Sequence, residues 1–434
     1  MNLATAPQSP PPAHAGRRRN VLLLTIDAWR SDFVDTFAGV PLLPALQPLW
    51  PHTLRFDHAY TSGPWTSPGI ISMLTGESAP RHGVHYEWSA PRPDTPALPA
   101  QLLRAGYRVP NLCYLNRVGN YAGLGYPAAE SPGYPTGPDD DLPLRALRTL
   151  HAQPTDAPWF AWYHYKYVHL PYGTSPSHRR LFGIDDAGAC LPPRVRDSVA
   201  KLFVVPRADH PLQPEDRDVV QRLYAAGVRQ MNDFLARIFA ELDALHLWDD
   251  TTVVLTADHG DELLEHGHVG HASTSHYATL FEEVLRIPLI VIDTRWRAAR
   301  RSDRRVTIGD LFPTLLSLCG QDGGAAQSGT VGGAVDLSPL WAASPVQPAA
   351  LTDDRILLFH SSRMGYQTPR RCDGQTVAGF SDGRQKYIYE SYDNPRRLLF
   401  DLAADPAEQS PQTDGPDVDR AHARLLQLLA EAGR

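Results

Sequence analysis

The stretch Thr251 to His271, which reads TTVVLTADHGDELLEHGHVGH, decides how the chain folds. Its first six residues are apolar or β-branched and predict a short buried strand. A carboxylate and an imidazole, Asp258 and His259, follow where that strand ends. Ligands of α/β proteins bind beyond the carboxyl ends of the strands, and these two groups together suit a divalent metal. We therefore expect a metal site at this edge of a sheet, the alternative being a polar loop with helix caps.

A second apolar strand, NVLLLTI at Asn20 to Ile26, also ends in a carboxylate, Asp27. A single Asp at a strand end is commonly a helix cap. Because Asp258 and His259 stand at the end of a similar strand, metal binding is favoured over a helix cap as the role of Asp27.

A hydroxyl is expected at the start of a helix within Thr61 to Gly76. The helix is predicted to begin at Thr66 or Ser67, because Pro68 suits the first turn and Gly76 suits the C-terminal end. Thr66 then lies where free backbone N–H groups and the helix dipole favour an anion. Its hydroxyl is either a cap or a nucleophile that a metal or base activates.

The remaining chain alternates strand and helix patterns. Strands are expected at 54–60, 107–114, 159–166 and 287–292, and helices at 98–106, 215–248, 276–285 and 309–319. This alternation predicts an α/β fold with a large, mostly parallel sheet flanked by helices. After a Gly-, Ala- and Pro-rich boundary, short strands at 356–360, 376–380, 386–390 and 397–402 and a helix at 418–432 predict a small antiparallel subdomain. We expect a flexible arm at 1–19, a catalytic domain at 20–350 and a C-terminal subdomain at 351–434.

Composition narrows the class of partner. The chain has 434 residues, beyond the roughly 250–300 at which single cores tend to split. Its net charge of −7 gives no basic field for nucleic acid, and no apolar stretch of about 18 residues could span a bilayer. Residues 1–19 lack the apolar region of a signal peptide, and the four cysteines lack C-x-x-C spacing. We expect a reduced cytoplasmic protein that acts on a small molecule, without a nucleic-acid or membrane partner; a homo-oligomer is left open.

Six segments, in order, resemble the sulfatase-like branch of the alkaline phosphatase superfamily, from about residue 20 to about residue 409. They are NVLLLTIDAWRSD, TSPGIISMLTG with APRHGV, YHYKYVHLPY, LTADHGDELLEHGHVGH with FEEVLRIPLIV, TIGDLFPTLLSLCG, and RQKYIYE with LLFDLAADPAEQ. The resemblance implies an alkaline-phosphatase-like sheet, a nucleophile and an anion pocket beside a divalent metal (Zn, Mn or Ca). The residues it implies are the nucleophile Thr66, the metal ligands Asp27, Thr66, Asp258 and His259, and the pocket histidines His169 and His271.

The two histidines are expected to stabilise charge on the transferring group or to protonate the leaving oxygen. A second metal is left open, for which His360 is a further candidate imidazole. Glu262 and Glu265 are expected on a solvated helix, and His266 and His268 around the site or at the surface.

The chain departs from the motif of the formylglycine sulfatases. Thr66 stands where they have Cys or Ser, Ile70 where they have Arg, Ala28 where many have a second acid, and His271 where they have a sulfate-binding Lys. Threonine cannot mature to formylglycine, so a hydroxyl nucleophile favours phosphate esters: phosphodiesters, phosphonate monoesters, or transfer of a phospho-substituted group. The alternatives are a sulfuric ester hydrolase that uses unmodified Thr66 and a metal-binding member without catalysis. Aromatic residues in the expected pocket loops, 116–140 and 173–212, favour an apolar or aromatic leaving group.

Overall fold

The structure is a computed structural model, and it describes most of the chain. The described residues are 18–86, 88–117, 121, 124–126, 132–135, 137–153, 155–185, 191–202, 211–272, 277–321, 332–341, 345–368, 370–372 and 374–433. The predicted N-terminal arm, Cys190 and parts of both predicted loops lie outside these ranges.

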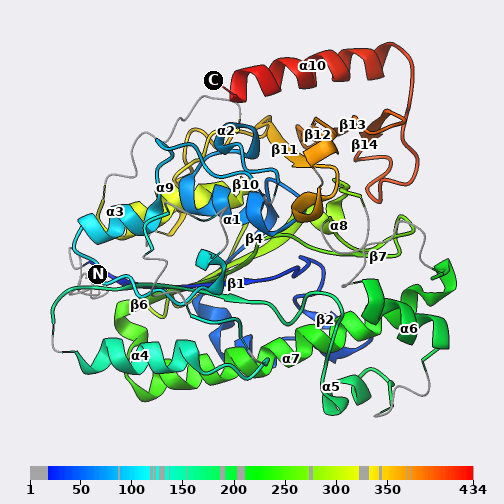
Figure 1. Cartoon of the computed structure of the whole chain (residues 1–434). Helices are drawn as coiled ribbons and strands as arrows, with labels where there is room; N and C mark the ends of the chain where they lie inside the picture. The colour runs from blue at the N-terminus through cyan, green and yellow to red at the C-terminus, as the bar shows by residue number, and fades with distance from the viewer. Residues whose placement is uncertain are drawn as a thin grey trace, which may run out of the picture.

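A six-stranded sheet in the order β10-β4-β9-β6-β1-β5 forms the centre of the molecule (Figure 1). Its strands are β1 (Asn20–Ile26), β4 (Thr53–Tyr60), β5 (Phe160–Tyr165), β6 (Thr251–Ala257), β9 (Arg286–Ile292) and β10 (Arg300–Thr307). β1 is parallel to β5 and β6, and β10 is parallel to β4, whereas β9 is antiparallel to β4 and β6. Five strands therefore share one direction, which confirms the predicted mostly parallel sheet.

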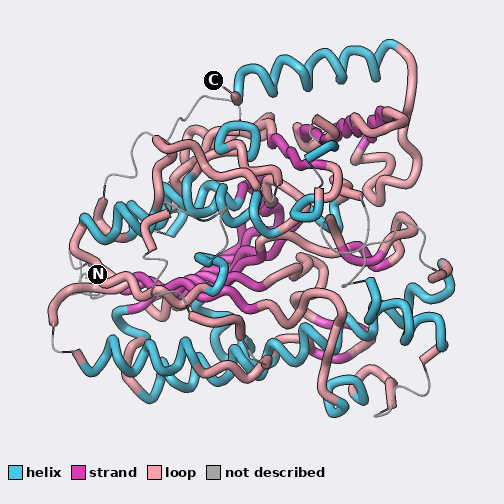
Figure 2. Tube along the Cα trace, in the orientation of Figure 1, coloured by secondary structure: helices cyan, strands magenta, loops and turns pink. Residues whose placement is uncertain are grey.

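Helices cover both faces of this sheet, as expected where central strands such as β1 and β6 are buried along almost their whole length. Figure 2 shows the strands between two layers of helix. One layer contains α1 (Thr66–Thr75), α3 (Leu98–Arg104) and α9 (Leu311–Leu318), and the other contains α4 (Leu142–Ala152) and α7 (Arg217–Ala244). The shorter helices are α2 (Ala79–His82), α5 (Pro176–Arg180), α6 (Pro193–Leu202) and α8 (Glu282–Leu285), with 3₁₀ turns η1 (Pro44–His52), η2 (Tyr114–Arg117), η5 (Pro214–Asp216), η6 (Trp248–Asp250), η7 (Ile308–Asp310), η8 (Ser338–Trp341), η9 (Gly365–Gln367) and η10 (Arg370–Cys372). Two small hairpins pair β2 (Thr36–Phe37) with β3 (Val40–Pro41) and β7 (Glu262–Leu263) with β8 (Val269–Gly270).

A four-stranded antiparallel sheet follows at the C-terminal end, with α10 (Pro416–Ala432) packed on it (Figure 1). Its strands are β11 (Leu357–Ser362), β12 (Thr376–Ser381), β13 (Gln385–Glu390) and β14 (Arg396–Asp401). Alternate side chains point to opposite faces: Leu358 and Leu399 pack with α10, whereas Leu357 and Leu398 pack with the segment around α8. The predicted small antiparallel sheet with a closing helix is confirmed.

Three local predictions were wrong or incomplete. Residues 107–114 form only isolated bridges, of Arg108 to Trp159 and of Asn111 to Trp162, because Pro110 interrupts the run of backbone donors that a strand needs. The helix predicted at 276–285 is restricted, in its described part, to Glu282–Leu285, since the backbone of Ala278 hydrogen-bonds to Arg363 beyond β11. The edge strand β10 was missed because its sequence, RRSDRRVT, is arginine-rich and mostly uncovered.

Among the described helices, none combines the length and apolarity that a bilayer crossing requires.

Candidate active site

The ends of β1 and β6 bring three predicted metal ligands together. The parallel register pairs Ile26 with Ala257, so Asp27 and Asp258 follow side by side. His259 Nε2 lies 3.5 Å from Asp27 Oδ1 and 3.4 Å from Asp258 Oδ2, and all three side chains are buried. Their ligand atoms are close enough to share one metal ion.

The donor set fits a divalent cation. His259 Nδ1 donates to the Gly260 carbonyl at 2.8 Å, so Nε2 is the nitrogen that faces the two carboxylates. Among the described residues, none donates a hydrogen bond to Asp27 Oδ1 or Asp258 Oδ2, although both atoms are buried. Buried carboxylate oxygens require a counter-charge, and two carboxylates with one imidazole are ligands that Zn²⁺ or Mn²⁺ accepts.

The pKa values of the cluster show that it stabilises positive charge. Burial raises the pKa of Asp258, and the charge of Asp27 adds to the shift. Burial opposes the ionisation of Asp27 as well, but His169, His164 and His259 hold the pKa of that carboxyl well below its usual range. Although burial disfavours an imidazolium, Asp258 and Asp27 raise the pKa of His259 to about 9. A cation at this point, whether a proton or a metal ion, is therefore favoured.

The N-terminus of α1 places the Thr66 hydroxyl against the same cluster. Thr66 Oγ1 lies 3.4 Å from His259 Nε2. The N-cap residue of α1 is Trp65, and no side-chain hydrogen bond caps this described helix. The geometry therefore disfavours the alternative that the Thr66 hydroxyl is a helix cap.

Gly69 explains how α1 approaches so closely. A Cβ at this position would lie 2.3 Å from the carbonyl oxygen of Asp258 and 2.8 Å from Thr61 Oγ1. A side chain is therefore excluded at Gly69 in the first turn of α1, where the helix packs against the backbone of Asp258.

His271 and His169 continue the site beyond His259. The His271 ring lies 4.1 Å from the His259 ring and 4.7 Å from the His169 ring, between centroids. His271 Nδ1 contacts Asp261 Oδ1 at 2.5 Å, and the hydroxyl of Tyr172 donates to Asp261 Oδ2 at 3.0 Å. Asp261 was not singled out in the sequence, where its spacing of two residues after His259 was the only signal.

His164 is a second residue that sequence reasoning missed. It lies on β5, in register with Thr25 of β1, and its Nε2 is 3.4 Å from Asp27 Oδ2 and 3.9 Å from Asp258 Oδ2. Its Nδ1 contacts the Thr25 hydroxyl at 2.8 Å, and that hydroxyl also accepts the indole N–H of Trp162. A histidine in the aromatic run WFAWYHYK was the available signal.

The prediction of a solvated helix for Glu262 and Glu265 was wrong. Glu262 is fully buried in the β7–β8 hairpin and accepts a hydrogen bond from Thr279. The Glu265 side chain is 4% exposed because the guanidinium of Arg30 pairs with it at 2.9 Å. His266 stacks on Phe281 and pairs with Glu283, and it ligates neither candidate metal group among the described residues.

His360 also lies apart from the cluster. Its Nδ1 faces His85 Nδ1 at 3.0 Å, and its backbone N–H donates to the Ser62 carbonyl.

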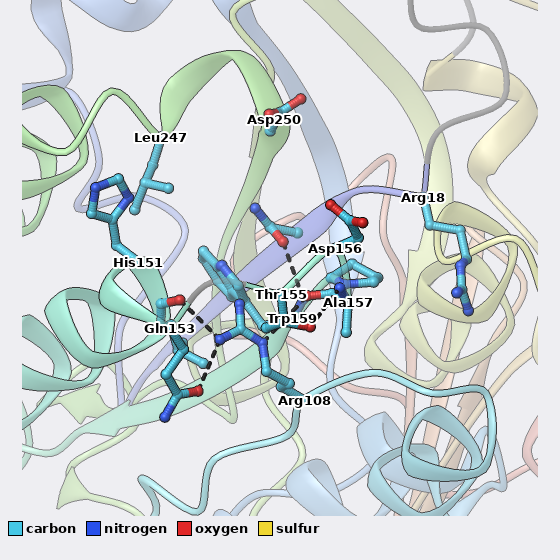
Figure 3. A pocket seen from close by; sticks show the side chains of 13 residues that line it. Arg18, Arg108, His151, Gln153, Thr155, Asp156, Ala157, Trp159, Leu247 and Asp250 are labelled. Atoms are coloured by element: carbon cyan, nitrogen blue, oxygen red, sulfur yellow. Dashed lines mark hydrogen bonds between the residues drawn. The ribbon is translucent and has the colours of Figure 1, made fainter.

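Two cavities differ in their relation to the cluster. One of about 320 Å³ includes Asp27 and His169 in its lining. Another of about 200 Å³ lies at the amino end of β1, beside Arg18, Arg108 and His151 (Figure 3). In that second cavity Arg108 donates to the Leu150 carbonyl and the Gln153 side chain at the end of α4. The second cavity thus lies at the amino ends of the strands, opposite to the cluster at their carboxyl ends.

The fold and the acidic–imidazole cluster define a protein of the alkaline phosphatase superfamily with a candidate metal centre. The chain belongs to the sulfatase family, whose model, described as Sulfatase, matches residues 19–321. The family resemblance expected from the six segments is therefore confirmed.

Three known proteins illustrate the range of this likeness. The multifunctional alkaline phosphatase superfamily protein PehA of Trinickia caryophylli is 25% identical over 324 residues, covering 66% of this chain and 57% of PehA. The choline-sulfatase of Rhizobium meliloti (strain 1021) is 22% identical over 458 residues, covering 93% of this chain and 84% of that protein. The crystal structure of the phosphonate monoester hydrolase of Agrobacterium radiobacter is similar with a TM-score of 0.70 and 20% identity, covering 96% of each chain. The match to PehA thus spans just over half of PehA's length.

Proposed function

We propose that this chain hydrolyses phosphate esters, specifically phosphodiesters or phosphonate monoesters, through a covalent intermediate on Thr66. The observation that carries the proposal is the 3.4 Å contact between Thr66 Oγ1 and His259 Nε2, the nitrogen that also faces Asp27 and Asp258. A hydroxyl and a metal-ligand cluster that meet at one point are the parts a metal-activated nucleophile needs. The likeness to PehA and to the Agrobacterium phosphonate monoester hydrolase supports this choice of substrate.

The chain's own groups can account for both halves of the reaction. A divalent ion held by Asp27, Asp258 and His259 supplies Lewis-acid chemistry and activates the hydroxyl when bound. Thr66 Oγ1 passes its proton to solvent water and attacks phosphorus, and the bond from phosphorus to the ester oxygen breaks. His271 gives the departing oxygen a proton and then takes one from the water that attacks the phosphothreonine, and the freed Thr66 oxygen regains a proton from solvent water.

Two further side chains orient these groups. Asp261 accepts the Nδ1–H of His271, so Nε2 is the atom available to exchange a proton with the substrate. His169, next to the His271 ring, stabilises negative charge on the transferring group.

A second candidate is hydrolysis of sulfuric esters with an unmodified Thr66. It is favoured by the choline-sulfatase likeness, which extends over 93% of this chain. Against it stands Thr66 itself, which cannot become the formylglycine of the usual sulfatase route.

A metal-reconstituted activity panel tests the proposal. Aryl phosphodiester, phosphonate monoester, phosphomonoester and sulfate substrates are compared for the wild type, Thr66→Ala and Ser67→Ala. We expect diester or phosphonate turnover that falls by about 10³-fold or more in Thr66→Ala, since removal of an attacking hydroxyl removes the covalent route. Ser67→Ala is the matched control, because the Ser67 hydroxyl contacts Tyr121 at 3.3 Å.

Mass spectrometry of acid-quenched wild type supplies an independent readout, in which the peptide containing Thr66 carries the phosphonyl or phosphoryl group. Turnover of the sulfate ester alone would establish the second candidate. Phosphonate turnover that survives in Thr66→Ala would remove Thr66 from the mechanism.

A further inference from the structure

The cavity beside the catalytic cluster has a composition unlike that of the cluster. Its volume is about 320 Å³, and its walls include three tyrosines, Tyr114, Tyr134 and Tyr167, with Leu170 and Pro171. Asp27 and His169 line the same cavity, so a ligand that fills it lies next to the proposed reacting centre. Apolar and aromatic walls with a few polar groups are typical of pockets that bind an organic group.

Lys166 is the cation of this cavity. It follows β5 directly, at the sheet edge where the proposed ligands lie. Its Nζ lies 4.0 Å from the ring centroid of Tyr134, 5.3 Å from that of Tyr167 and 5.9 Å from that of Tyr114. Such ring faces hold an ammonium in place by cation–π attraction without neutralising its charge.

The ammonium has donors to offer to a ligand. Within the described part of the chain, Lys166 makes no hydrogen bond or ion pair at its amino group, and its side chain is only half-buried. An ammonium carries three N–H donors, which ring faces satisfy poorly. By contrast Lys386, another of the three lysines in the chain, is fully buried between Glu282 and Glu408.

The reacting group does not require this lysine. In the proposed function the charge of the reacting group would be met by a metal ion that Asp27, Asp258 and His259 would hold, and by His169 and His271. The contacts of Lys166 are instead with the aromatic walls, where the rest of the substrate would lie.

We propose that this cavity binds the organic group of the ester, and that Lys166 selects organic groups that bear a negative charge of their own, such as an aryl carboxylate. The tyrosine faces contact the ring of that group, and the ammonium pairs with its carboxylate. The choice of the ester's organic group rests on the proposed function, whereas the binding preference is measurable without turnover.

Unreactive arylphosphonic acids test the binding preference, because their P–C bond gives no leaving alcohol. The probes are 4-carboxyphenylphosphonate and 4-carbamoylphenylphosphonate, which differ in that the carbamoyl group carries no charge. Both are titrated calorimetrically into metal-loaded wild type, Lys166→Gln and Arg363→Gln. In the wild type we expect the carboxylate probe to bind about tenfold more tightly than the carbamoyl probe, as for one partly buried charge pair. In Lys166→Gln the preference disappears, while the carbamoyl probe keeps its affinity to within about threefold.

Arg363→Gln is the matched control. Arg363 also lies over a tyrosine, with its Cζ 4.0 Å from the Tyr277 ring centroid, but it lines a different cavity. It should leave the preference unchanged.

A spectroscopic readout reports on Lys166 itself. Because the chain has three lysines, reductive ¹³C-methylation gives few signals, and the Lys166 signal is the one missing in Lys166→Gln. We expect this signal to shift with the carboxylate probe and to stay unchanged with the carbamoyl probe.

The outcomes separate this inference from the proposed function. Equal binding of both probes, or equal weakening of both in Lys166→Gln, would overturn the inference even if phosphonate esters are turned over. A Lys166-dependent preference in a protein that turns over no phosphorus ester would support the cavity assignment and refute the proposed chemistry. Wild type that binds neither probe would overturn the inference.

Discussion

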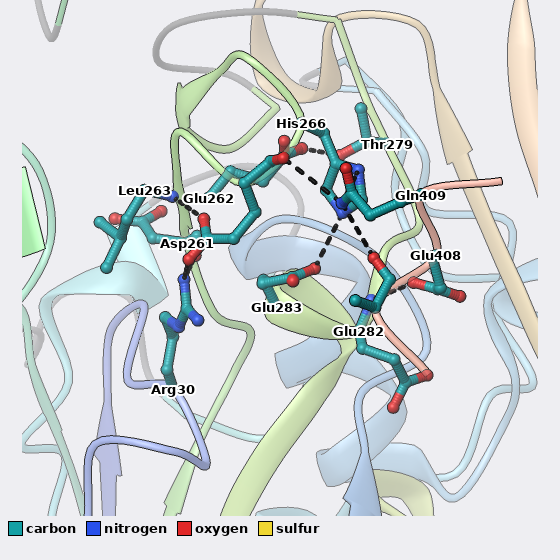
Figure 4. Close-up of polar contacts among 12 residues, drawn as sticks. Arg30, Asp261, Glu262, Leu263, His266, Thr279, Glu282, Glu283, Glu408 and Gln409 are labelled. Atoms are coloured by element: carbon teal, nitrogen blue, oxygen red, sulfur yellow. Dashed lines mark hydrogen bonds and ion pairs between the residues drawn. The ribbon is translucent and has the colours of Figure 1, made fainter. Parts of the chain in front are cut away.

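Replacement of Asp261 by Asn tests whether His271 gives and takes a proton at its Nε2. Asp261 is fully buried, with one oxygen 2.5 Å from His271 Nδ1 and the other accepting the Tyr172 hydroxyl at 3.0 Å (Figure 4 shows where it lies). An amide of the same shape has one oxygen and one NH₂ group. If the oxygen stays with Tyr172, the NH₂ group faces His271 Nδ1, which must then act as an acceptor. The proton moves to Nε2, and the imidazole presents the wrong tautomer for taking a proton there.

The size of the effect follows from what is lost. General acid–base catalysis contributes about 10²–10⁴-fold, so kcat should fall by that factor in Asp261→Asn, or roughly 3–5 kcal/mol of transition-state stabilisation. One buried polar contact is also mismatched, which costs about 1–3 kcal/mol of folding stability. The metal content should not change, since the proposed ligands Asp27, Asp258 and His259 keep their contacts.

The assay combines kcat on the best phosphonate or diester substrate, metal content by elemental analysis, and denaturant unfolding. Tyr172→Phe is the control, because it removes the other partner of Asp261 and leaves the His271 contact in place; we expect kcat within about tenfold of the wild type. The residues His259, Asp261 and His271 are also close enough to hold a metal. Loss of bound metal in step with activity would therefore refute the positioning role and make Asp261 a ligand of a second ion. Unchanged kcat would remove His271 as the group that transfers the proton.

Two predictions concern stability. Lys386→Met leaves Glu408 buried without its counter-charge at 2.8 Å, so we expect about 3–5 kcal/mol of destabilisation at pH 7. Much of this loss should be recovered in the double variant Lys386→Met/Glu408→Gln. Equal stability of the single variant and the wild type in urea would contradict the prediction. Burial lowers the pKa of His82 from 6.5 to about 3, so the unfolded protein binds a proton at this histidine more readily than the folded protein does. The neutral His82 therefore does not reduce the free energy of unfolding above pH 6.5, and the folded state loses stability as the pH falls from 6.5 toward 3. Between pH 7 and pH 5 we expect this histidine to cost about 2 kcal/mol of unfolding free energy in the wild type and nothing in His82→Gln, and parallel pH profiles of the two proteins would disprove it.

The convergence of the cluster could be predicted because it depends on local patterns and one general rule. Two apolar strands are each followed by an Asp side chain. Because the C-terminal ends of neighbouring parallel strands lie at the same edge of a sheet, the two side chains meet there. His164 could not be placed in the same way. Its position beside Asp27 depends on the register of β5 against β1, which pairs residues 139 positions apart.

The burial of Glu265 could not be predicted because its partner is distant in the sequence. Glu262 and Glu265 follow the metal motif and look like solvated residues of a helix. The partner that allows Glu265 to be buried is Arg30, which is 235 residues earlier in the chain. Single-sequence reasoning assigns an isolated acid to the surface because a buried one is costly without its pair.

Ala28 shows how this chain accommodates its departure from the sulfatase motif. Its φ of 60° is left-handed, which costs about 1–2 kcal/mol for a residue other than glycine. Two hydrogen bonds offset that cost: its N–H donates to Asp258 Oδ1 at 3.2 Å, and its carbonyl accepts the Tyr224 hydroxyl at 2.7 Å. A backbone dipole thus neutralises part of Asp258 where many sulfatases have a second carboxylate. In the proposed function Asp27 and Asp258 would balance the charge of one divalent ion, and an acid at position 28 would add a negative charge that repels an anionic ester.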